Sequence, residues 1–359
     1  MNSRLHDDER IASIRRSLGE QNLDALLVSL PRHVLMLTGY YPVVGTSLAI
    51  CTREGQVGLL APEDEKQFAQ RAGADQSEYF KPVTLDEILP LGECVVRPMQ
   101  RLAAKLELKP GRIGMESGPA SEPSSYSALN FYGPALREVA GEVWPSAEFS
   151  DAQRMLRQLC AVKTQNELRH IRTACSVAAA GFESGRTEIT SGISEMQLAA
   201  RFSADFAAAA ASAGIDRQHA FVYCMSGPNS AHAYYAYAHS TARNLSWRDW
   251  ALVHCNSHAG GYWTDITRTY VMGEHTEPHR EMFQAVLEAR DAALAAVHPG
   301  AKASSVDSAA RDVIEKYGFK DAFKHQTGHG VGFGAINAHA LPRIHPKSED
   351  VLEPGMVFN

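Results

Sequence analysis

The sequence predicts an α/β domain over residues 1–150 and an α+β domain over 151–359 in which one structural unit occurs twice. Two observations predict this arrangement. The 359 residues exceed an ordinary domain, which has about 150. In the second part, a pattern of helix, glycine turn, helix and then strands occurs twice, about 110 residues apart. We therefore expect an internal duplication of a two-helix, antiparallel-sheet unit.

The first 150 residues alternate between helical and strand patterns. Apolar periodicity predicts a helix over 8–20, followed by a buried strand over 25–30. Strand-like runs at 47–52 and 57–60 flank a short polar segment that contains Gly55, which predicts a hairpin. No cluster of chemically active residues is evident here. We expect this domain to support the second one or to set its specificity.

The second part begins with helices that carry their own start signals. T-x-x-E and S-x-x-Q capping boxes begin at Thr164 and Ser194 and predict the first helix pair. Strand-like segments follow around 220–272. A second pair of helices is expected over 281–297 and 304–317.

Composition excludes several classes of protein. Thirty-five Lys and Arg against 41 Asp and Glu give a net charge of −6, which argues against nucleic-acid binding. No stretch approaches the ~20 apolar residues of a membrane span, and the charged opening MNSRLHDDER is unlike a signal peptide. Six cysteines without a C-x-x-C pair are typical of reduced thiols. We expect a cytoplasmic enzyme.

The histidines are unevenly distributed. Twelve of the 15 lie between His219 and His345. Histidine is the side chain most suited to binding metal or moving protons near neutral pH. The second domain is therefore where we expect the active site.

A candidate site lies in the predicted hairpin over 250–270. If its tip falls between Ala259 and Gly260, His254 and Asp265 are cross-strand partners. Both side chains would then converge on one metal ion or one substrate atom. A core histidine paired with Asp265 would give the same sequence, so both interpretations stay open for His254.

Two further histidines lie near the end of the chain. His329 stands within Gly328-His329-Gly330-Val331-Gly332, where glycines allow the backbone to approach a ligand closely. Without a strand–turn–helix context, these glycines are not a dinucleotide loop. His339 follows ten residues later, beside a loop restricted by Pro342.

Several motifs resemble the pita-bread-fold family, which includes aminopeptidase P, prolidase, methionine aminopeptidase and creatinase. They are TDITRT after a GY pair, GHGVG, and the closing LEPGMVF. LDALLVSLPRHVLMLTGY resembles the amino-terminal domain of creatinase and prolidase. The resemblance implies an N-terminal domain of that type and a pita-bread catalytic domain with pseudo-twofold halves.

The resemblance also implies a set of metal ligands. Family peptidases hold two divalent ions with two aspartates, one histidine and two glutamates. Asp265 falls on the second aspartate and His329 on the histidine, while His254 stands where the first aspartate is expected. An imidazole can ligate Zn, Mn, Fe or Co but cannot bridge two ions as a carboxylate does. Both glutamates are expected beyond Asn359, so we interpret the catalytic domain as truncated at its C-terminal end.

The substrate-handling positions differ from the family pattern as well. After the G-x-N of Gly227 and Asn229, Tyr234 stands where a histidine is expected. The HExP motif falls on His339 to Pro342, with Ala340 in place of glutamate. We therefore take His339, His254 and Tyr234 as catalytic candidates.

These observations predict a hydrolase of amide C–N bonds, an Xaa-Pro aminopeptidase or dipeptidase-like metallopeptidase. Asp265, His329 and His254 would hold a divalent ion (Mn, Co, Zn or Fe) that activates water. His339 would stabilise the tetrahedral intermediate. The substrate would be a small peptide and, by resemblance, the protein a homodimer.

Two alternatives remain open. One is a metal-independent, creatinase-like hydrolase of a small amide or guanidino substrate, in which the same cluster moves protons. The other is a catalytically impaired pseudo-enzyme that acts as a binding module. A facial iron triad also fits two histidines and one carboxylate, but the fold resemblance disfavours an oxygenase.

Overall fold

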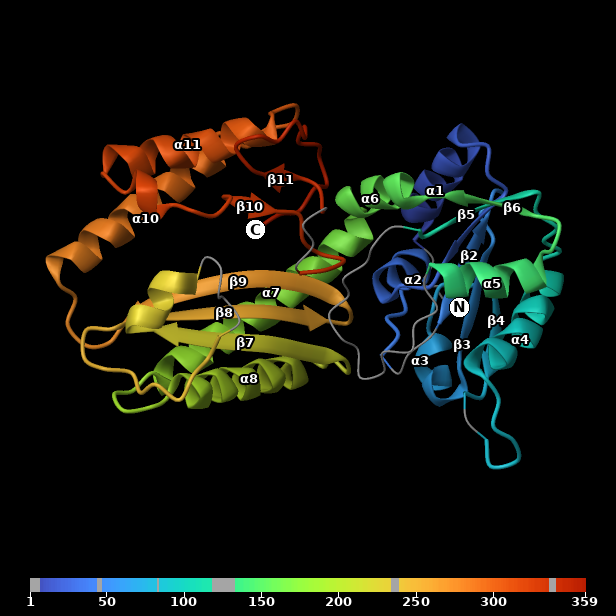
Figure 1. Cartoon of the computed structure of the whole chain (residues 1–359), viewed down its shortest axis with the longest axis horizontal. Coiled ribbons are helices and arrows are strands. Elements are labelled where there is room, and N and C mark those ends of the chain that lie inside the picture. The colour runs from blue at the N-terminus through green and yellow to red at the C-terminus, as the bar shows by residue number, and fades with distance from the viewer. Residues whose placement is uncertain (1–6, 44–46, 83, 118–132, 234–238, 336–339) are drawn as a thin grey trace. The chain divides into compact units, whose positions relative to one another are not determined.

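The computed structural model describes residues 7–43, 47–82, 84–117, 133–233, 239–335 and 340–359 (Figure 1). The chain divides into two compact units, Met1–Cys160 and Ala161–Asn359. The sequence-based boundary at residue 150 falls before the last helix of the first unit. No helix among the described residues is both long enough and apolar enough to cross a membrane.

The first unit is built on a six-stranded mixed sheet with the order β4-β3-β2-β1-β5-β6. The predicted helix over 8–20 and the predicted hairpin are confirmed. The strands are β1 (Ala25–Val28), β2 (Leu48–Thr52), β3 (Val57–Pro62), β4 (Gln76–Phe80), β5 (Arg112–Met115) and β6 (Glu148–Asp151). The helices are α1 (Asp8–Glu20), α2 (Pro31–Thr38), α3 (Lys66–Ala69), α4 (Leu91–Lys105), α5 (Pro134–Val143) and α6 (Gln153–Ala161), with a 3-10 turn at Glu63–Glu65.

Helix α2 is fixed at both ends by its sequence. Pro31 occupies the first turn, where its missing N–H costs nothing, and Gly39 ends the helix with φ 71°. Every residue of α2 is buried, including the polar His33. The central strand β1 is also buried along its whole length. Polar side chains at the junction of β1 and α2 therefore need partners within the unit.

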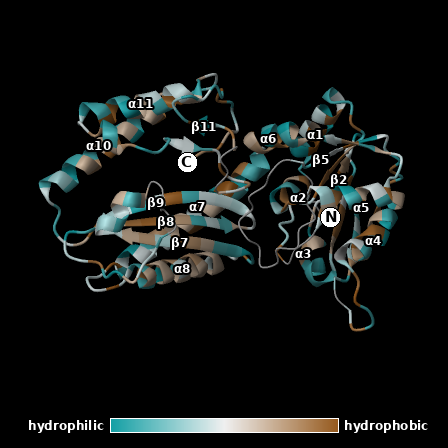
Figure 2. Ribbon diagram, viewed as in Figure 1, coloured by the Kyte–Doolittle hydropathy of each residue, from teal (hydrophilic) through white to brown (hydrophobic). Residues whose placement is uncertain are grey.

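The second unit places two helices against a three-stranded antiparallel sheet, β7-β8-β9. Both predicted capping boxes are present, at the starts of α7 and α8. Helix α7 contacts β8 and β9, whereas α8 contacts β7, and Figure 2 shows hydrophobic residues along the middle strand. The elements are α7 (Gln165–Gly185), α8 (Glu195–Ser212), β7 (Gln218–Ser226), β8 (Trp250–Ala259) and β9 (Tyr262–Val271), with 3-10 turns at Arg186–Glu188 and Gly227–His232.

The second helix pair repeats the pattern of the first. Helices α10 (Glu277–Ala295) and α11 (Ala303–Lys316) precede the short antiparallel pair β10 (Gly328–His329) and β11 (Arg343–Ile344), with a 3-10 turn at Lys320–Ala322. The predicted start of α10 at residue 281 is wrong by four residues. Thr276 caps the helix, and His279 takes the capping-box position that Glu or Gln usually fills. The sequence pattern did not reveal this substitution.

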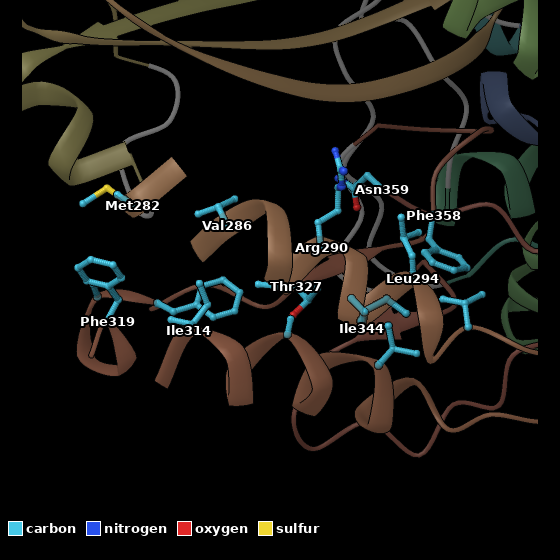
Figure 3. Close-up of a pocket in the computed structure, with 17 residues that line it drawn as sticks. Met282, Val286, Arg290, Leu294, Ile314, Phe319, Thr327, Ile344, Phe358 and Asn359 are labelled. Atoms are coloured by element: carbon cyan, nitrogen blue, oxygen red, sulfur yellow. The ribbon is translucent and has the colours of Figure 1, made fainter. Parts of the chain in front are cut away.

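An apolar groove of about 490 Å³ lies along α10 and α11. Figure 3 shows Met282, Val286 and Leu294 from α10 on one side and Ile314 and Phe319 on the other. Met282, Val286 and Leu294 are exposed. The lining is mostly apolar and includes none of His254, Asp265 and His329, so the groove is not the candidate site.

The register of the β8–β9 hairpin differs from the predicted one. His254 pairs with Thr267, and Asp265 pairs with Asn256. The turn is centred on Gly260 and Gly261, with φ of 61° and 87°, and a two-residue turn of this kind requires positive φ at both positions. Asp265 therefore pairs two residues along β8 from His254, its predicted partner. Because side chains alternate with a period of two, Asp265 stays on the same face as His254.

Candidate functional site

Three of the predicted site residues line one cavity in the second unit. His254 comes from β8, Asp265 from β9 and His329 from β10. Nε2 of His329 lies 3.3 Å from Oδ2 of Asp265, and Nδ1 of His254 lies 3.8 Å from Oδ1 of the same carboxylate. Tyr234 and His339, the other two predicted site residues, lie outside the described residues.

Two close backbone approaches place His329. A Cβ on Gly328 would collide with the Asn359 carbonyl, and one on Gly330 would collide with the Leu341 carbonyl. Glycine is therefore required on both sides of the histidine. Asn359 also holds it directly, since its Oδ1 accepts from the His329 N–H at 2.8 Å. The GHG motif thus positions the imidazole through backbone packing.

The ring of His329 has a defined orientation. Nδ1 lies 3.2 Å from the Gly330 carbonyl, which can only accept, so this nitrogen carries a proton. Nε2 then faces the carboxylate of Asp265. The pKa of His329 is raised overall. Burial alone would lower it, but the hydrogen bonds to Asp265 and to the Gly330 carbonyl outweigh the effect of burial. Two acceptors at 3.3 Å repel each other unless a proton or a metal ion lies between them.

His254 is held by neighbours that the sequence analysis did not identify. Its Nε2 lies 2.7 Å from Nδ2 of Asn256, and its Nδ1 lies 3.0 Å from Oγ1 of Thr267. An amide N–H can only donate, so Nε2 accepts and Nδ1 carries the proton. Burial lowers the pKa of His254, which favours this neutral form. A correct hairpin register would have placed Asn256 and Thr267 beside the site.

The described residues fit part of a divalent metal site. Asp265 supplies carboxylate oxygens, and His329 supplies Nε2 while its other nitrogen donates to a carbonyl, as metal-bound histidines commonly do. Oδ1 of Asn256 is buried and has no hydrogen-bond partner within the described part of the chain. In that same part, no group of three or more His, Cys, Asp or Glu residues is arranged to hold a metal ion. His254 does not fit as a ligand in its present hydrogen bonding.

A buried carboxylate in the second unit was also missed. Glu195 accepts hydrogen bonds from Ser226, Asn229 and Thr241, at 2.6 to 3.1 Å. Burial alone would raise the pKa of Glu195, but the Thr241 and Ser226 hydrogen bonds outweigh it and lower the pKa. Glu195 thereby ties together the two ends of the segment that contains Tyr234. Its position as the first residue of α8 gave no signal of this role.

Comparisons with known proteins cover nearly the whole chain. Residues 169–359 match the model of metallopeptidase family M24, and residues 10–159 match the creatinase/prolidase N-terminal domain. The Xaa-Pro dipeptidase of Pyrococcus furiosus is 27% identical over 350 residues, which are 98% of this chain and 88% of that protein. A probable dipeptidase of Mycobacterium tuberculosis is 34% identical over 212 residues, 58% of this chain and 53% of that protein.

Solved structures show the same fold. The prolidase from Pyrococcus horikoshii superposes with a TM-score of 0.73 at 24% identity, covering 98% of this chain and 89% of that one. The Xaa-Pro dipeptidase from Bacillus anthracis gives a TM-score of 0.76 at 20% identity, with coverages of 98% and 89%. These likenesses confirm the fold class predicted from the sequence.

Proposed function

The chain belongs to metallopeptidase family M24, and from this premise we propose that it hydrolyses the peptide bond that precedes a proline. One observation of the site carries the proposal. Asp265 of the DITRT motif and His329 of the GHG motif, far apart in sequence, meet at 3.3 Å beside a cavity of about 480 Å³. Relatives named Xaa-Pro dipeptidase align along 98% of the chain, which favours this peptidase activity over others.

We assign each residue a role in that reaction. Asp265 and His329 would hold a divalent ion, which supplies an activated water and polarises the substrate carbonyl. Asn359 holds the backbone N–H of His329, and the Gly330 carbonyl contacts Nδ1 of the ring, so that Nε2 faces the site. His254 acts as a positioning residue whose Nδ1 side faces Asp265. His339 would stabilise the charge of the tetrahedral intermediate, and Tyr234 would contact substrate.

Family membership implies dependence on a divalent metal in general. The choice among Mn, Co, Zn and Fe is part of the proposal, as are a small Xaa-Pro peptide as substrate and a homodimer in the cytoplasm. The comparisons do not favour the alternatives of a metal-independent, creatinase-like hydrolase or a binding module without activity.

The decisive experiment tests two properties separately, the dependence of activity on metal and the length of the peptide that is cleaved. The protein is stripped of metal, supplied with Mn, Co, Zn or Fe one at a time, and given Ala-Pro, Ala-Pro-Ala or Ala-Ala. Proline release from Ala-Pro alone indicates a dipeptidase. Cleavage of the tripeptide indicates an aminopeptidase. If Ala-Ala is cleaved as fast as Ala-Pro, or if no metal restores cleavage of either proline peptide, the proposal is wrong.

A further inference from the structure

Asn256 contacts the candidate site and has one unsatisfied side-chain atom. The residue is 4% exposed, and its Nδ2 lies 2.7 Å from Nε2 of His254. Its Oδ1 is buried and has no hydrogen-bond partner within the described part of the chain. A buried acceptor without a donor is costly, and an unsatisfied atom of this kind in a folded protein calls for a bound water or ion.

The orientation of the Asn256 amide agrees with the ring beside it. Nδ1 of His254 lies 3.0 Å from Oγ1 of Thr267 and 3.8 Å from Oδ1 of Asp265, so the ring proton belongs on Nδ1. Nε2 then accepts, and the group next to it is the NH2 of Asn256. Turning the amide over would place its oxygen against the lone pair of Nε2. Oδ1 is therefore the part of the amide turned away from His254.

Neither residue that pairs with Asn256 across the sheet can donate to this oxygen. Asn256 stands between Phe221 of β7 and Asp265 of β9. Phe221 packs against Trp263, with ring centroids 6.2 Å apart and the rings nearly parallel, and its side chain has no polar atom. A carboxylate can only accept, and directly opposed residues of a sheet have Cβ atoms about 5 Å apart on the same face. Two acceptors placed in this way favour a cation between them.

The Asp265 carboxylate has a second acceptor beside it. Nε2 of His329 lies 3.3 Å from Oδ2 of Asp265, and the Gly330 carbonyl keeps the proton of that ring on Nδ1. An amide oxygen, a carboxylate and an imidazole nitrogen thus come from β8, β9 and β10. All three are groups that divalent ions such as Mn take as ligands in proteins. His254 cannot take the place of the amide oxygen, because the lone pair of its Nε2 is occupied by Asn256.

We propose that Oδ1 of Asn256 is a third protein ligand of the divalent ion that Asp265 and His329 hold. This inference rests on the proposed function, which assigns that ion to the two side chains. The family resemblance leads us to expect a carboxylate at position 254, and Asn256 lies two residues further along the same face of β8. Its oxygen supplies the ligand from β8 that His254 does not. The site then has one negative charge fewer than an aspartate on β8 would give it.

The affinity for metal tests this assignment without depending on activity. The full chain is stripped of metal and titrated with Mn, and free Mn is followed by electron paramagnetic resonance. Asn256→Leu keeps the approximate size of the side chain but removes its oxygen, and we expect it to weaken Mn binding at least about ten-fold. Asn256→Asp keeps an oxygen and adds charge, so it should bind Mn at least as tightly as the wild type. Ser257→Ala, at the next buried residue on the opposite face of β8, should leave the affinity unchanged.

A second comparison separates a direct ligand from an effect through His254. His254→Asn removes the imidazole that Nδ2 of Asn256 contacts but leaves Oδ1 in place, so it should bind Mn nearly as tightly as the wild type. The visible absorption of the Co-loaded protein reports the ligands directly. We expect that spectrum to change in Asn256→Leu and to stay as in the wild type in Ser257→Ala.

The outcomes distinguish this inference from the proposed function. Wild-type Mn affinity in Asn256→Leu, or an equal loss in His254→Asn, overturns the ligand assignment. The peptidase proposal survives that result if the wild type binds metal and Asp265→Asn does not. A wild-type chain that binds none of Mn, Co, Zn and Fe overturns both. Circular dichroism shows whether each variant folds, and if Asn256→Leu does not, weaker Mn binding in Asn256→Asp than in the wild type overturns the assignment.

Discussion

Nε2 of His329 lies 3.3 Å from Oδ2 of Asp265 and is the nitrogen of that ring turned away from the Gly330 carbonyl. The geometry brings a lone pair and a carboxylate together, and only a cation between them makes the arrangement favourable. In the absence of a metal ion, that cation is a proton shared between Nε2 of His329 and the carboxylate of Asp265. A divalent ion would replace that proton, so metal binding and deprotonation of His329 are coupled.

Asp265→Asn tests this relationship with little change in shape. The amide keeps the size of the side chain but removes its negative charge. Neither a proton on Nε2 of His329 nor a divalent ion at that position then has a carboxylate to pair with. We expect loss of bound metal and a fall in kcat/KM for Ala-Pro of at least about 100-fold. Metal content is measured by elemental mass spectrometry. Asp291→Asn, at an exposed position on α10, is the control and should retain both properties. Wild-type metal content in Asp265→Asn would contradict the assignment.

Glu195 should make stability depend on pH in the acid range. Its pKa is lowered in the folded protein, so its contribution is complete above the ordinary glutamate pKa and is lost as the pH falls through the folded value. We expect Glu195→Gln to lower the free energy of unfolding by about 2 kcal/mol at pH 7, because charged hydrogen bonds are lost.

The same variant should lose less stability than the wild type as the pH falls below about 4.5, since it has no carboxyl group to titrate there. Urea unfolding at several pH values measures both effects. Parallel pH profiles for the two proteins would show that Glu195 does not carry this dependence.

Local signals in the sequence were sufficient for most of the fold. The start of α7 follows from the side-chain hydrogen bonds that Thr164 and Glu167 form with nearby backbone N–H groups, and such contacts lie within four residues. The predicted helix over 8–20 ends where the structure ends it. Motif resemblance pointed to Asp265 and His329, whose side chains the structure brings together. The glycines on both sides of His329 reflect a steric requirement that can be read directly in the sequence.

Contacts between distant segments could not be read in this way. The register of the β8–β9 hairpin, by contrast, was readable, because it depends on which two residues take positive φ. Gly260-Gly261 tolerates positive φ at both positions and Ala259-Gly260 does not, and the prediction overlooked this signal. Glu195 acquires its partners, Ser226, Asn229 and Thr241, through tertiary packing. Nothing in the residues adjacent to Glu195 predicts them.

Close packing of α7 on α8 gives a prediction about stability. A Cβ on Gly181 would lie 2.8 Å from the ring of Phe206 and 3.1 Å from its Cα, and a backbone atom cannot move away easily. We expect Gly181→Ala to destabilise the protein by about 1–3 kcal/mol through overpacking. Gly141→Ala, on the open side of α5, should instead stabilise it by about 0.5–1 kcal/mol. Thermal unfolding compares the two variants, and equal shifts would contradict the close contact.

His254→Asp tests why an imidazole stands where the family resemblance leads us to expect a carboxylate. His254 is bonded through both ring nitrogens, to Asn256 and Thr267, and is neutral. It therefore adds neither charge nor a bridging group to the pair formed by Asp265 and His329. We expect the wild-type protein to retain about one divalent ion per chain after dialysis, because a second ion close to the first needs a bridging carboxylate to offset their repulsion.

The aspartate in His254→Asp would supply that bridge on the same face of the sheet as Asp265, and we expect bound metal to rise to about two ions per chain. His254→Asn is the matched control, because it makes a similar change in size and loses the same imidazole contacts without adding charge. Elemental analysis of all three proteins, loaded with Mn and dialysed together, gives the comparison. If His254→Asn gains metal as His254→Asp does, the imidazole excludes the second ion by its size. If the wild type already holds two ions, His254 is itself a ligand and its hydrogen bonds to Asn256 and Thr267 rearrange on metal binding.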